Sequence, residues 1–371
     1  MLTETFAIPS NAPGTRHELQ VLRFGTPGAS PKAYIHGALH ADEVPAILVA
    51  QQLRHRLEAL EATGQILGEV VLVPFANPLG LSQQVLGQHH GRFDLRDGGN
   101  FNRAFPDLSG PLLEAVHDKL TDDAHRNTLL IRTTLRDLAY RLQAATPAEH
   151  LKNQLLQLAV DADVVLDLHC DTEAVMHLYA LTPQAEVAQQ LGAALQAQAV
   201  LLATESGGSP FDEACTRPWY LLQQQLPQAP VPLACFAATV ELRGATDTSH
   251  ALAQQDADGL VQFLRLRGVL APGGSVLKPA LCEPTPLSAS EPLSAPHAGV
   301  VVFRRTPGER VLAGDAIVDL VYVLTGAVTT LHCVSGGILY AHCGSRWAHG
   351  GKRLAKIAGT ALVRTGPLLS A

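Results

Sequence analysis

Strand-like and helical segments alternate along the first 270 residues, and this alternation is the strongest constraint on the fold. Short apolar runs are separated by longer stretches that carry apolar residues at helical spacing. The pattern predicts an α/β fold, with a largely parallel, mixed sheet and helices on both faces. The expected strands are 19–24, 32–36, 69–74, 163–168, 198–203 and 235–242. The clearest expected helices are 43–61, 183–197, 213–225 and 249–267.

Two stretches depart from this alternation. Residues 112–162 carry leucines at helical spacing and predict two or three inserted helices. Two roles are open for these helices: they form a wall over a pocket, or they only pack against the sheet. After residue 270 the chain is first rich in Pro, Ser and Gly, and then turn glycines and short strands recur, 299–314 against 337–351. The repeat predicts a small all-β barrel or sandwich. We therefore expect an α/β domain over 1–270 and a β domain over 271–371.

The β repeat resembles the lipoyl- and biotinyl-carrier architecture. However, no lysine lies within residues 318–335, where the modified residue of a carrier would project. We therefore reject a carrier function. Two His-Cys steps in this region, His332-Cys333 and His342-Cys343, are expected to belong to the core rather than to a second metal site.

His40 and Glu43 stand in a turn between an expected strand and an expected helix. A His and a Glu three residues apart in such a turn can both point at one spot beyond the sheet. Imidazole nitrogen and carboxylate oxygen suit zinc, and a catalytic zinc needs three protein ligands and an open position. The same spacing also occurs in turns whose charged residues are only solvated. His36, one helical turn earlier, is a competing ligand.

His169 is the best candidate for the third ligand. It directly follows the expected strand 163–168, and open α/β sheets bind their ligands beyond the carboxyl ends of the strands. The alternative is a core histidine that is held by Asp167 or Asp171.

The glycine-punctuated loop 91–107 is rich in arginine and asparagine. Arginine suits the capture of a carboxylate through two parallel hydrogen bonds, or the stabilisation of developing negative charge. A phosphate-binding loop or a surface loop with salt bridges would have the same density of basic residues. Farther along, Glu241 ends the expected strand 235–242. It is either a strand-end partner of Arg243 or, beside a metal-activated water, a general base.

The order of these clusters resembles the zinc carboxypeptidase superfamily and, within it, the succinylglutamate desuccinylase/aspartoacylase family. The passages GALHADE, NFNRAFPDL, DLHCD and TVELRG carry the resemblance, which spans about residues 30–250. It implies one zinc ion per chain, bound by His40, Glu43 and His169.

The resemblance also implies roles for residues around the metal. Asn102 and Arg103 match the pair that holds the free carboxylate of the substrate, and Glu241 matches the general base and acid. Arg92 matches the arginine that polarises the scissile carbonyl, although the long gap to Asn102 makes Arg96 a competitor. The active-site tyrosine of the family has no single match, and these candidates stay open: Tyr179, Tyr220, Tyr322 and Tyr340.

The implied function is that of a zinc-dependent amide hydrolase that deacylates small N-acyl amino acids, with the β domain narrowing the active-site mouth. One alternative is a metallocarboxypeptidase that trims short peptides; a domain over the mouth disfavours long substrates. The other is a non-catalytic metal- or ligand-binding protein, which would not need a general base at Glu241. A nicotinamide-type enzyme is disfavoured because no G-x-G-x-x-G follows an early strand.

Composition narrows the setting in which the protein works. A net charge of −7 over 371 residues gives no basic surface for nucleic acid. No apolar run reaches the ~20 residues that span a bilayer, and the amino terminus lacks the pattern of a signal peptide. The six scattered cysteines suit a reducing compartment, so we expect a cytoplasmic enzyme. A homo-oligomer is compatible with the sequence.

Overall fold

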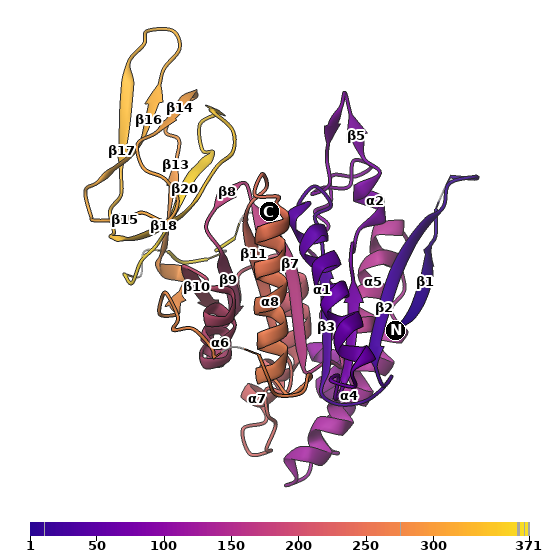
Figure 1. Cartoon of the computed structure of the whole chain (residues 1–371). Helices are drawn as coiled ribbons and strands as arrows, with labels where there is room; N and C mark the ends of the chain where they lie inside the picture. The colour runs from indigo at the N-terminus through magenta and orange to yellow at the C-terminus, as the bar shows by residue number, and fades with distance from the viewer. Residues whose placement is uncertain (11, 275, 362–363, 367, 370–371) are drawn as a thin grey trace.

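The centre of the fold is one large mixed sheet (Figure 1). The computed structural model describes residues 1–10, 12–274, 276–361, 364–366 and 368–369. In spatial order, the strands of this sheet are β1 (Leu2–Ile8), β2 (His17–Gly25), β4 (Glu69–Val73), β3 (Lys32–Gly37), β7 (Val164–Asp171), β11 (Phe236–Gly244), β9 (His177–Leu181), β10 (Ala199–Ala203) and β12 (Thr285–Pro286).

The parallel strands β4, β3, β7 and β11 form the middle of the sheet. Their carboxyl ends therefore meet at one edge, and polar residues that follow them in the sequence become neighbours in space. In β7 and β11, His169 pairs directly with Glu241. The antiparallel strand β9 then runs back along β11, with His177 opposite Glu241.

Helices cover both faces of the sheet, as the alternating pattern predicts. One face packs against α1 (Pro45–Ala62), α6 (Ala185–Leu195) and α8 (His250–Leu266). The other face packs against α3 (Ser109–Val116), α4 (Ala124–Tyr140), α5 (Pro147–Ala159) and α7 (Phe211–Gln225). The predicted α/β class with a largely parallel, mixed sheet is thus confirmed.

The inserted helices α3, α4 and α5 belong to the packing of this second face. Leu135 and Leu155 are fully buried in its core, and burying a leucine contributes about 1.5–3 kcal/mol. Local signals set where α5 begins, since Thr146 and Glu149 form a capping box around Pro147. Of the two roles open for residues 112–162, packing is therefore the one that these contacts support.

Two antiparallel sheets follow the large sheet in the sequence. One contains β13 (Ser290–Ser294), β20 (Arg353–Ala358), β18 (Gly337–His342) and β15 (Arg310–Val311). The other contains β17 (Val328–His332), β16 (Ala316–Val321), β14 (Gly299–Phe303) and β19 (Trp347–Ala348). The first half of the sequence repeat contains β14 and β15, and the second half contains β18 and β19. In each half, the two strands belong to different sheets.

These sheets touch the large sheet at the edge where the parallel strands end. The short strand β8 (Glu173–Ala174) pairs with β18, and Lys356 of β20 forms an ion pair with Asp171 of β7. The predicted boundary at residue 270 stays a prediction; β12, which follows it, still joins the large sheet. Residues 275, 362–363, 367 and 370–371 of the predicted β domain lie outside the described residues.

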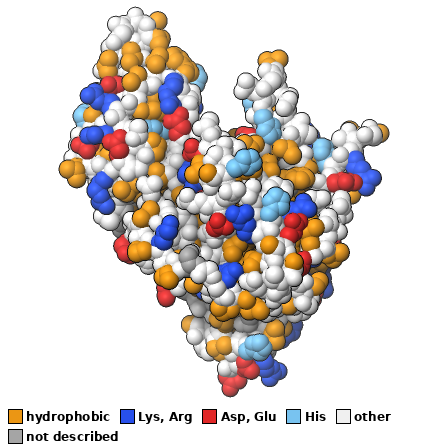
Figure 2. Space-filling model, in the orientation of Figure 1, with side chains coloured by type: hydrophobic (Ala, Val, Ile, Leu, Met, Phe, Trp, Pro, Cys, Tyr) orange, Lys and Arg blue, Asp and Glu red, His pale blue; other side chains and the backbone are white. Residues whose placement is uncertain are grey.

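The surface is hollowed between the carboxy-terminal sheets and the hairpin of β5 (Gln84–Val85) and β6 (Gln88–His89) (Figure 2). Charged side chains and histidines gather along the floor of this hollow. Throughout the described ranges, no helix has both the length and the hydropathy that crossing a bilayer requires.

Candidate metal centre and active site

The turn between β3 and α1 places His40 and Glu43 at the edge of the sheet. Gly37, at the end of β3, leaves no room for a side chain, because a Cβ there would lie 2.8 Å from the carbonyl oxygen of Ala46. The next residue, Ala38, has a φ of +57°, and the Glu43 N–H donates to the His40 carbonyl over 3.1 Å. The tight turn therefore brings the two side chains back over the strand ends.

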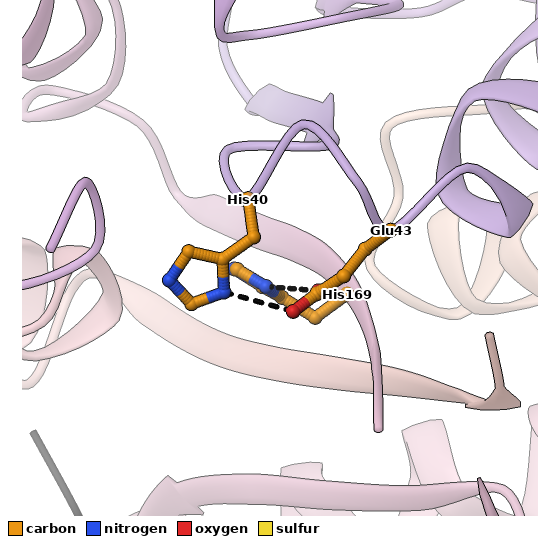
Figure 3. A group of neighbouring side chains, drawn as sticks. All are labelled: His40, Glu43 and His169. Carbon is orange, nitrogen blue, oxygen red and sulfur yellow. Dashed lines mark hydrogen bonds and ion pairs between the residues drawn. The ribbon is translucent and has the colours of Figure 1, made fainter. Parts of the chain in front are cut away.

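His40, Glu43 and His169 form one compact, buried cluster (Figure 3). His40 Nδ1 lies 2.9 Å from Glu43 Oε1, and His169 Nδ1 lies 2.7 Å from Glu43 Oε2. One ligand atom from each residue lies within 4.8 Å of the others. Two nitrogens and a carboxylate that converge in this way could bind a metal ion.

The outer nitrogens of both histidines are held by acceptors. His40 Nε2 lies 2.8 Å from Asn100 Oδ1, and His169 Nε2 lies 2.8 Å from Asp167 Oδ1. Each Nε2–H therefore donates outward, and each Nδ1, which faces Glu43, is the nitrogen that could bind a metal ion in place of a proton. Such outer partners fix the ring orientation and the tautomer of histidines that bind metals.

Charges within the cluster support one another. Burial alone would raise the pKa of Glu43, but His169 and His40 lower it overall. Burial alone would lower the pKa of His169, but Asp167 and Glu43 raise it well above its usual range. For His40, burial prevails over the attraction of Glu43 and lowers the pKa. Burial of these side chains is therefore offset by the attraction between the Glu43 carboxylate and the His169 imidazole.

His36 lies behind the cluster rather than in it. Its Nε2 donates to Asp167 Oδ1 over 2.6 Å, and its Nδ1 contacts the Tyr34 hydroxyl at 2.9 Å. Asp167 is fully buried and also receives the Asn102 amide on Oδ2 at 3.1 Å. His36 thus helps to hold the carboxylate that orients His169.

Of the two competing arginines, the structure brings Arg92 to the cluster. Its Nη1 lies 3.1 Å from both His40 Nδ1 and Glu43 Oε1. Arg96 instead bonds to Asp94, with Nε 2.9 Å from Oδ1, and does not line the pocket among the described residues. Arg92 is therefore the one of these two arginines that contacts the candidate metal ligands.

Asn102 and Arg103 follow in the same loop, and both line the pocket. The Asn102 side chain is already engaged, since it donates to Asp167 and accepts the Phe211 N–H at 2.9 Å. Arg103 donates to the Asn102 carbonyl over 2.6 Å. Burial and the charge of Arg92 lower the pKa of Arg103, while Asp212 opposes that change. Arg103 is thus a partly desolvated cation in the wall of the pocket.

Glu241 lies in the same pocket, on the strand next to His169. Its Oε2 is buried and has no hydrogen-bond partner in the part of the chain that the structure describes. Burial and the nearby charge of Glu43 raise the pKa of Glu241 to about 8, with His169 opposing them. No ion pair joins Glu241 to Arg243 among the described residues, because Arg243 pairs with Asp256. An unpaired carboxylate with a raised pKa can both take and give a proton near neutrality.

The pocket itself encloses about 900 Å³, counting its open mouth. Leu287, Arg353, Lys356 and Leu369 contribute to its wall from the carboxy-terminal part of the chain. None of the lining residues comes from 112–162 within the described chain.

Tyr179 is the one of the four candidate tyrosines that lines the pocket within the described chain. Tyr340 lies behind it, with its hydroxyl 2.9 Å from the Ser290 hydroxyl. Tyr322 directly follows β16 and contacts the ring of His297 edge-on, with ring centroids 5.6 Å apart.

The two His-Cys steps show no metal-binding geometry. His342 stacks on Phe303 with ring centroids 3.7 Å apart, and Cys333 is buried in the core of the β sheets. Over the described residues, His40, Glu43 and His169 are the one group of this kind that converges.

Sequence reasoning missed the residues that support the site. Asn100, Asp212 and Lys356 were not singled out, and Asp167 was considered only as a partner that would make His169 structural. The signal for Asp212 was faint, because an acidic residue in the first turn of a helix is common.

Comparisons with known proteins agree on one family. The sequence profile of the succinylglutamate desuccinylase/aspartoacylase catalytic domain matches residues 29–128. A succinylglutamate desuccinylase/aspartoacylase family protein from Shewanella amazonensis is 30% identical, with a TM-score of 0.84; the match covers 96% of this chain and 98% of that one. A succinylglutamate desuccinylase/aspartoacylase from Shewanella frigidimarina is 26% identical, with a TM-score of 0.84; the match covers 96% of this chain and 97% of that one.

A more distant structure shares the fold alone. The ectoine utilization protein EutE (DoeB) from Ruegeria pomeroyi is 17% identical, with a TM-score of 0.67, and 97% of this chain and 95% of that one are covered. No curated protein sequence matches this chain.

Proposed function

This chain belongs to the succinylglutamate desuccinylase/aspartoacylase family, and from that premise we propose that it is a zinc-dependent amide hydrolase acting on small N-acyl amino acids. The family is hydrolytic. The observation that carries the proposal is the convergence of a candidate metal cluster, an unpaired carboxylate and two arginines on one pocket.

The donor set fits zinc. Two imidazole nitrogens and one carboxylate are the ligands of many catalytic zinc sites, which keep a fourth position open. In this chain His40 Nδ1, His169 Nδ1 and the carboxylate of Glu43 would hold the ion. Zinc, when bound, would supply Lewis-acid polarisation of the substrate carbonyl and activation of a water molecule.

The remaining residues divide the chemistry among them. Glu241 takes the proton of the attacking water and passes it to the leaving amine, which its raised pKa allows. Arg92 donates to the carbonyl oxygen as that oxygen gains negative charge. Tyr179, in the pocket wall, is the candidate for an additional hydrogen bond to the substrate.

Arg103 binds the free carboxylate of the substrate, because it is a partly buried guanidinium that lines the pocket. Asn102 was predicted to share this role. Since its amide already bonds to Asp167 and the Phe211 N–H, we propose that it mainly positions Arg103 and His169. A direct bond to the substrate would require it to exchange one of these partners.

A metallocarboxypeptidase is the nearest alternative, since it would use the same groups. Arg353, Lys356 and Leu369 line the pocket from the carboxy-terminal part of the chain, which supports a small substrate over a peptide.

The test is a substrate panel for the zinc-loaded protein, with release of free amine as the readout. Acetyl-, succinyl- and formyl-amino acids should be hydrolysed, and their amide-capped analogues should be poor substrates. Arg103→Lys keeps the charge but loses the planar fork, so kcat/KM should fall roughly 10- to 100-fold for uncapped substrates alone. Equal cleavage of capped and uncapped substrates by the wild type would contradict the carboxylate-binding role. Release of C-terminal residues from peptides, with no deacylation, would favour the carboxypeptidase.

A further inference from the structure

One side chain of the inserted helices reaches the loop that carries much of the site. Lys152 lies on α5 and is half-buried. Its ammonium group donates to the carbonyl of Asn100 over 3.2 Å and to the carbonyl of Arg103 over 2.7 Å. The Nζ atom also lies 5.7 Å from the ring centroid of Phe105. Lys152 therefore contacts this loop at three points.

The loop residues that Lys152 holds lie directly behind the candidate ligands. The Asn100 side chain accepts from His40 Nε2 and, over 2.8 Å, from the Asn102 N–H. The Arg103 N–H donates to the Asn100 carbonyl over 3.3 Å, which closes a tight turn. Lys152 binds the carbonyl groups at both ends of this turn. The positions of Asn100 and Arg103 are therefore tied to one ammonium group.

Backbone hydrogen bonds hold the other side of the loop. Ala104 has a φ of +55°, a left-handed conformation that residues with a side chain rarely adopt. Its N–H donates to the Gly208 carbonyl over 2.7 Å, and the Phe105 N–H donates to the Ser209 carbonyl over 3.0 Å. A strained backbone of this kind persists where its surroundings hold it. Lys152 supplies the contacts on the α5 side, so the loop should shift when they are lost.

An ammonium group suits this role. It has three donor hydrogens and no acceptor, so it can bind two carbonyl oxygens at once. Hydrogen bonds from a charged donor are roughly twice as strong as those between neutral groups. Burial lowers the pKa of Lys152, and Asp97 and Glu149 oppose that change. The carbonyl contacts therefore compensate for taking the cation partly out of water.

We propose that Lys152 is a positioning residue, which sets the orientation of His40 through Asn100 and the place of the substrate carboxylate through Arg103. Within the described chain Lys152 does not line the pocket, so it acts through the loop. The inference gives the inserted helices a role in the site. Its second part rests on the proposed function, because it uses the role of Arg103 as the carboxylate-binding residue.

A lysine that bonds to two carbonyls also has a purely structural use, since it stabilises the packing of a helix on a loop. Gln157, on the same helix, has such a use: its amide donates to the Ala139 carbonyl of α4 over 3.1 Å. Lys152→Met and Gln157→Met each remove a side-chain bond from α5 to a carbonyl. Gln157→Met is therefore the matched control.

Zinc affinity is the first measurement, made on the full chain by competition with a chelating dye. Lys152→Met should bind zinc about 10-fold more weakly, because the outer partner of a metal-binding histidine is displaced. Gln157→Met should bind zinc as tightly as the wild type, since its lost bond does not involve the loop.

The second measurement separates KM from kcat at saturating zinc, with an N-acetyl amino acid that the wild type hydrolyses. Lys152→Met should raise KM about 10-fold and lower kcat less than about threefold, because a carboxylate-binding arginine contributes to ground-state binding. Gln157→Met should change neither constant.

Unchanged zinc affinity in Lys152→Met, or an equal loss in Gln157→Met, would overturn the inference for His40. An unchanged KM, or a fall in kcat as large as the rise in KM, would overturn it for Arg103. If Lys152→Met does not fold, Lys152→Gln is measured against the same criteria. Failure of the wild type to hydrolyse any N-acyl amino acid would instead reject the proposed function, and the zinc measurement would still decide on Lys152.

Discussion

At the scale of single residues, the candidate metal centre depends on where two protons lie. Asn100 and Asp167 hold the Nε2–H groups of His40 and His169, so both Nδ1 atoms are left for a cation. A carboxylate between two imidazoles could also be a plain buried ion-pair network. Removal of one imidazole distinguishes the two hypotheses, because the amount of bound metal falls only if the cluster is a metal site.

We expect His40→Ala and His169→Ala each to lose the zinc that the wild type retains at about one ion per chain. Metal analysis after gel filtration is the measurement. His36→Ala should weaken zinc binding only about 10- to 100-fold, because it acts through Asp167 rather than as a ligand. His332→Ala, on the exposed end of β17, is the control and should change nothing. Full zinc content in both ligand variants would exclude this site.

Glu241→Gln should keep the zinc and the fold but lose about 10²–10⁴-fold in kcat, since an amide cannot accept the proton of water. In the wild type, kcat/KM should rise with pH as the Glu241 carboxyl ionises. The apparent pKa of this rise should lie below about 8, because a bound divalent cation favours the carboxylate. Activity of the variant near the wild-type level would make Glu241 structural.

At the scale of elements, the site depends on how closely two loops pack. Gly91 lies against the turn that carries His40 and Glu43, and the Ala41 N–H donates to the Gly91 carbonyl over 3.0 Å. A Cβ on Gly91 would lie 2.1 Å from the Asp42 nitrogen. The loop that presents Arg92 and the turn that presents the candidate ligands are therefore fitted to each other.

Gly91→Ala should force these two segments apart, at a cost of about 1–3 kcal/mol in stability. Zinc affinity and kcat should both fall, because His40 and Arg92 lose their common position. Competition with a chelating dye gives the affinity. Gly110→Ala is the control, since a Cβ there meets nothing within 4 Å. Equal zinc affinity in the two variants would show that the packing is not needed.

The sequence predicted most of these elements and only part of the site. Apolar runs marked β3, β7 and β11, and polar residues at their ends marked the candidate ligands. The short strand β9 was missed, although it brings Tyr179 to the pocket. Contacts such as His36 with Asp167, 131 residues apart, leave no local pattern. They follow from strand order, which a single sequence does not reveal.

At the scale of the whole molecule, the carboxy-terminal sheets are joined to the catalytic region by charge as well as by strand pairing. Lys356 of β20 pairs with Asp171 at the end of β7, and Arg346 pairs with Glu173 of β8 at 2.8 Å. Lys356 also lowers the pKa of Glu241, whereas Asp171 raises it. The distant part of the chain therefore influences the group that we propose as the general base.

Lys356→Met should have two separable effects. Asp171 would be left as a largely buried carboxylate without its cation, so thermal unfolding should occur at a lower temperature, at a cost of about 3 kcal/mol. The pKa of Glu241 should also rise, because a cation that favours the carboxylate is gone, and the acid limb of kcat/KM should move to higher pH. The double variant Lys356→Met/Asp171→Asn removes both charges, so it should recover much of the stability and return the limb toward its wild-type position. If the single variant is destabilised but its pH profile does not move, Lys356 only tethers the sheets and does not tune Glu241.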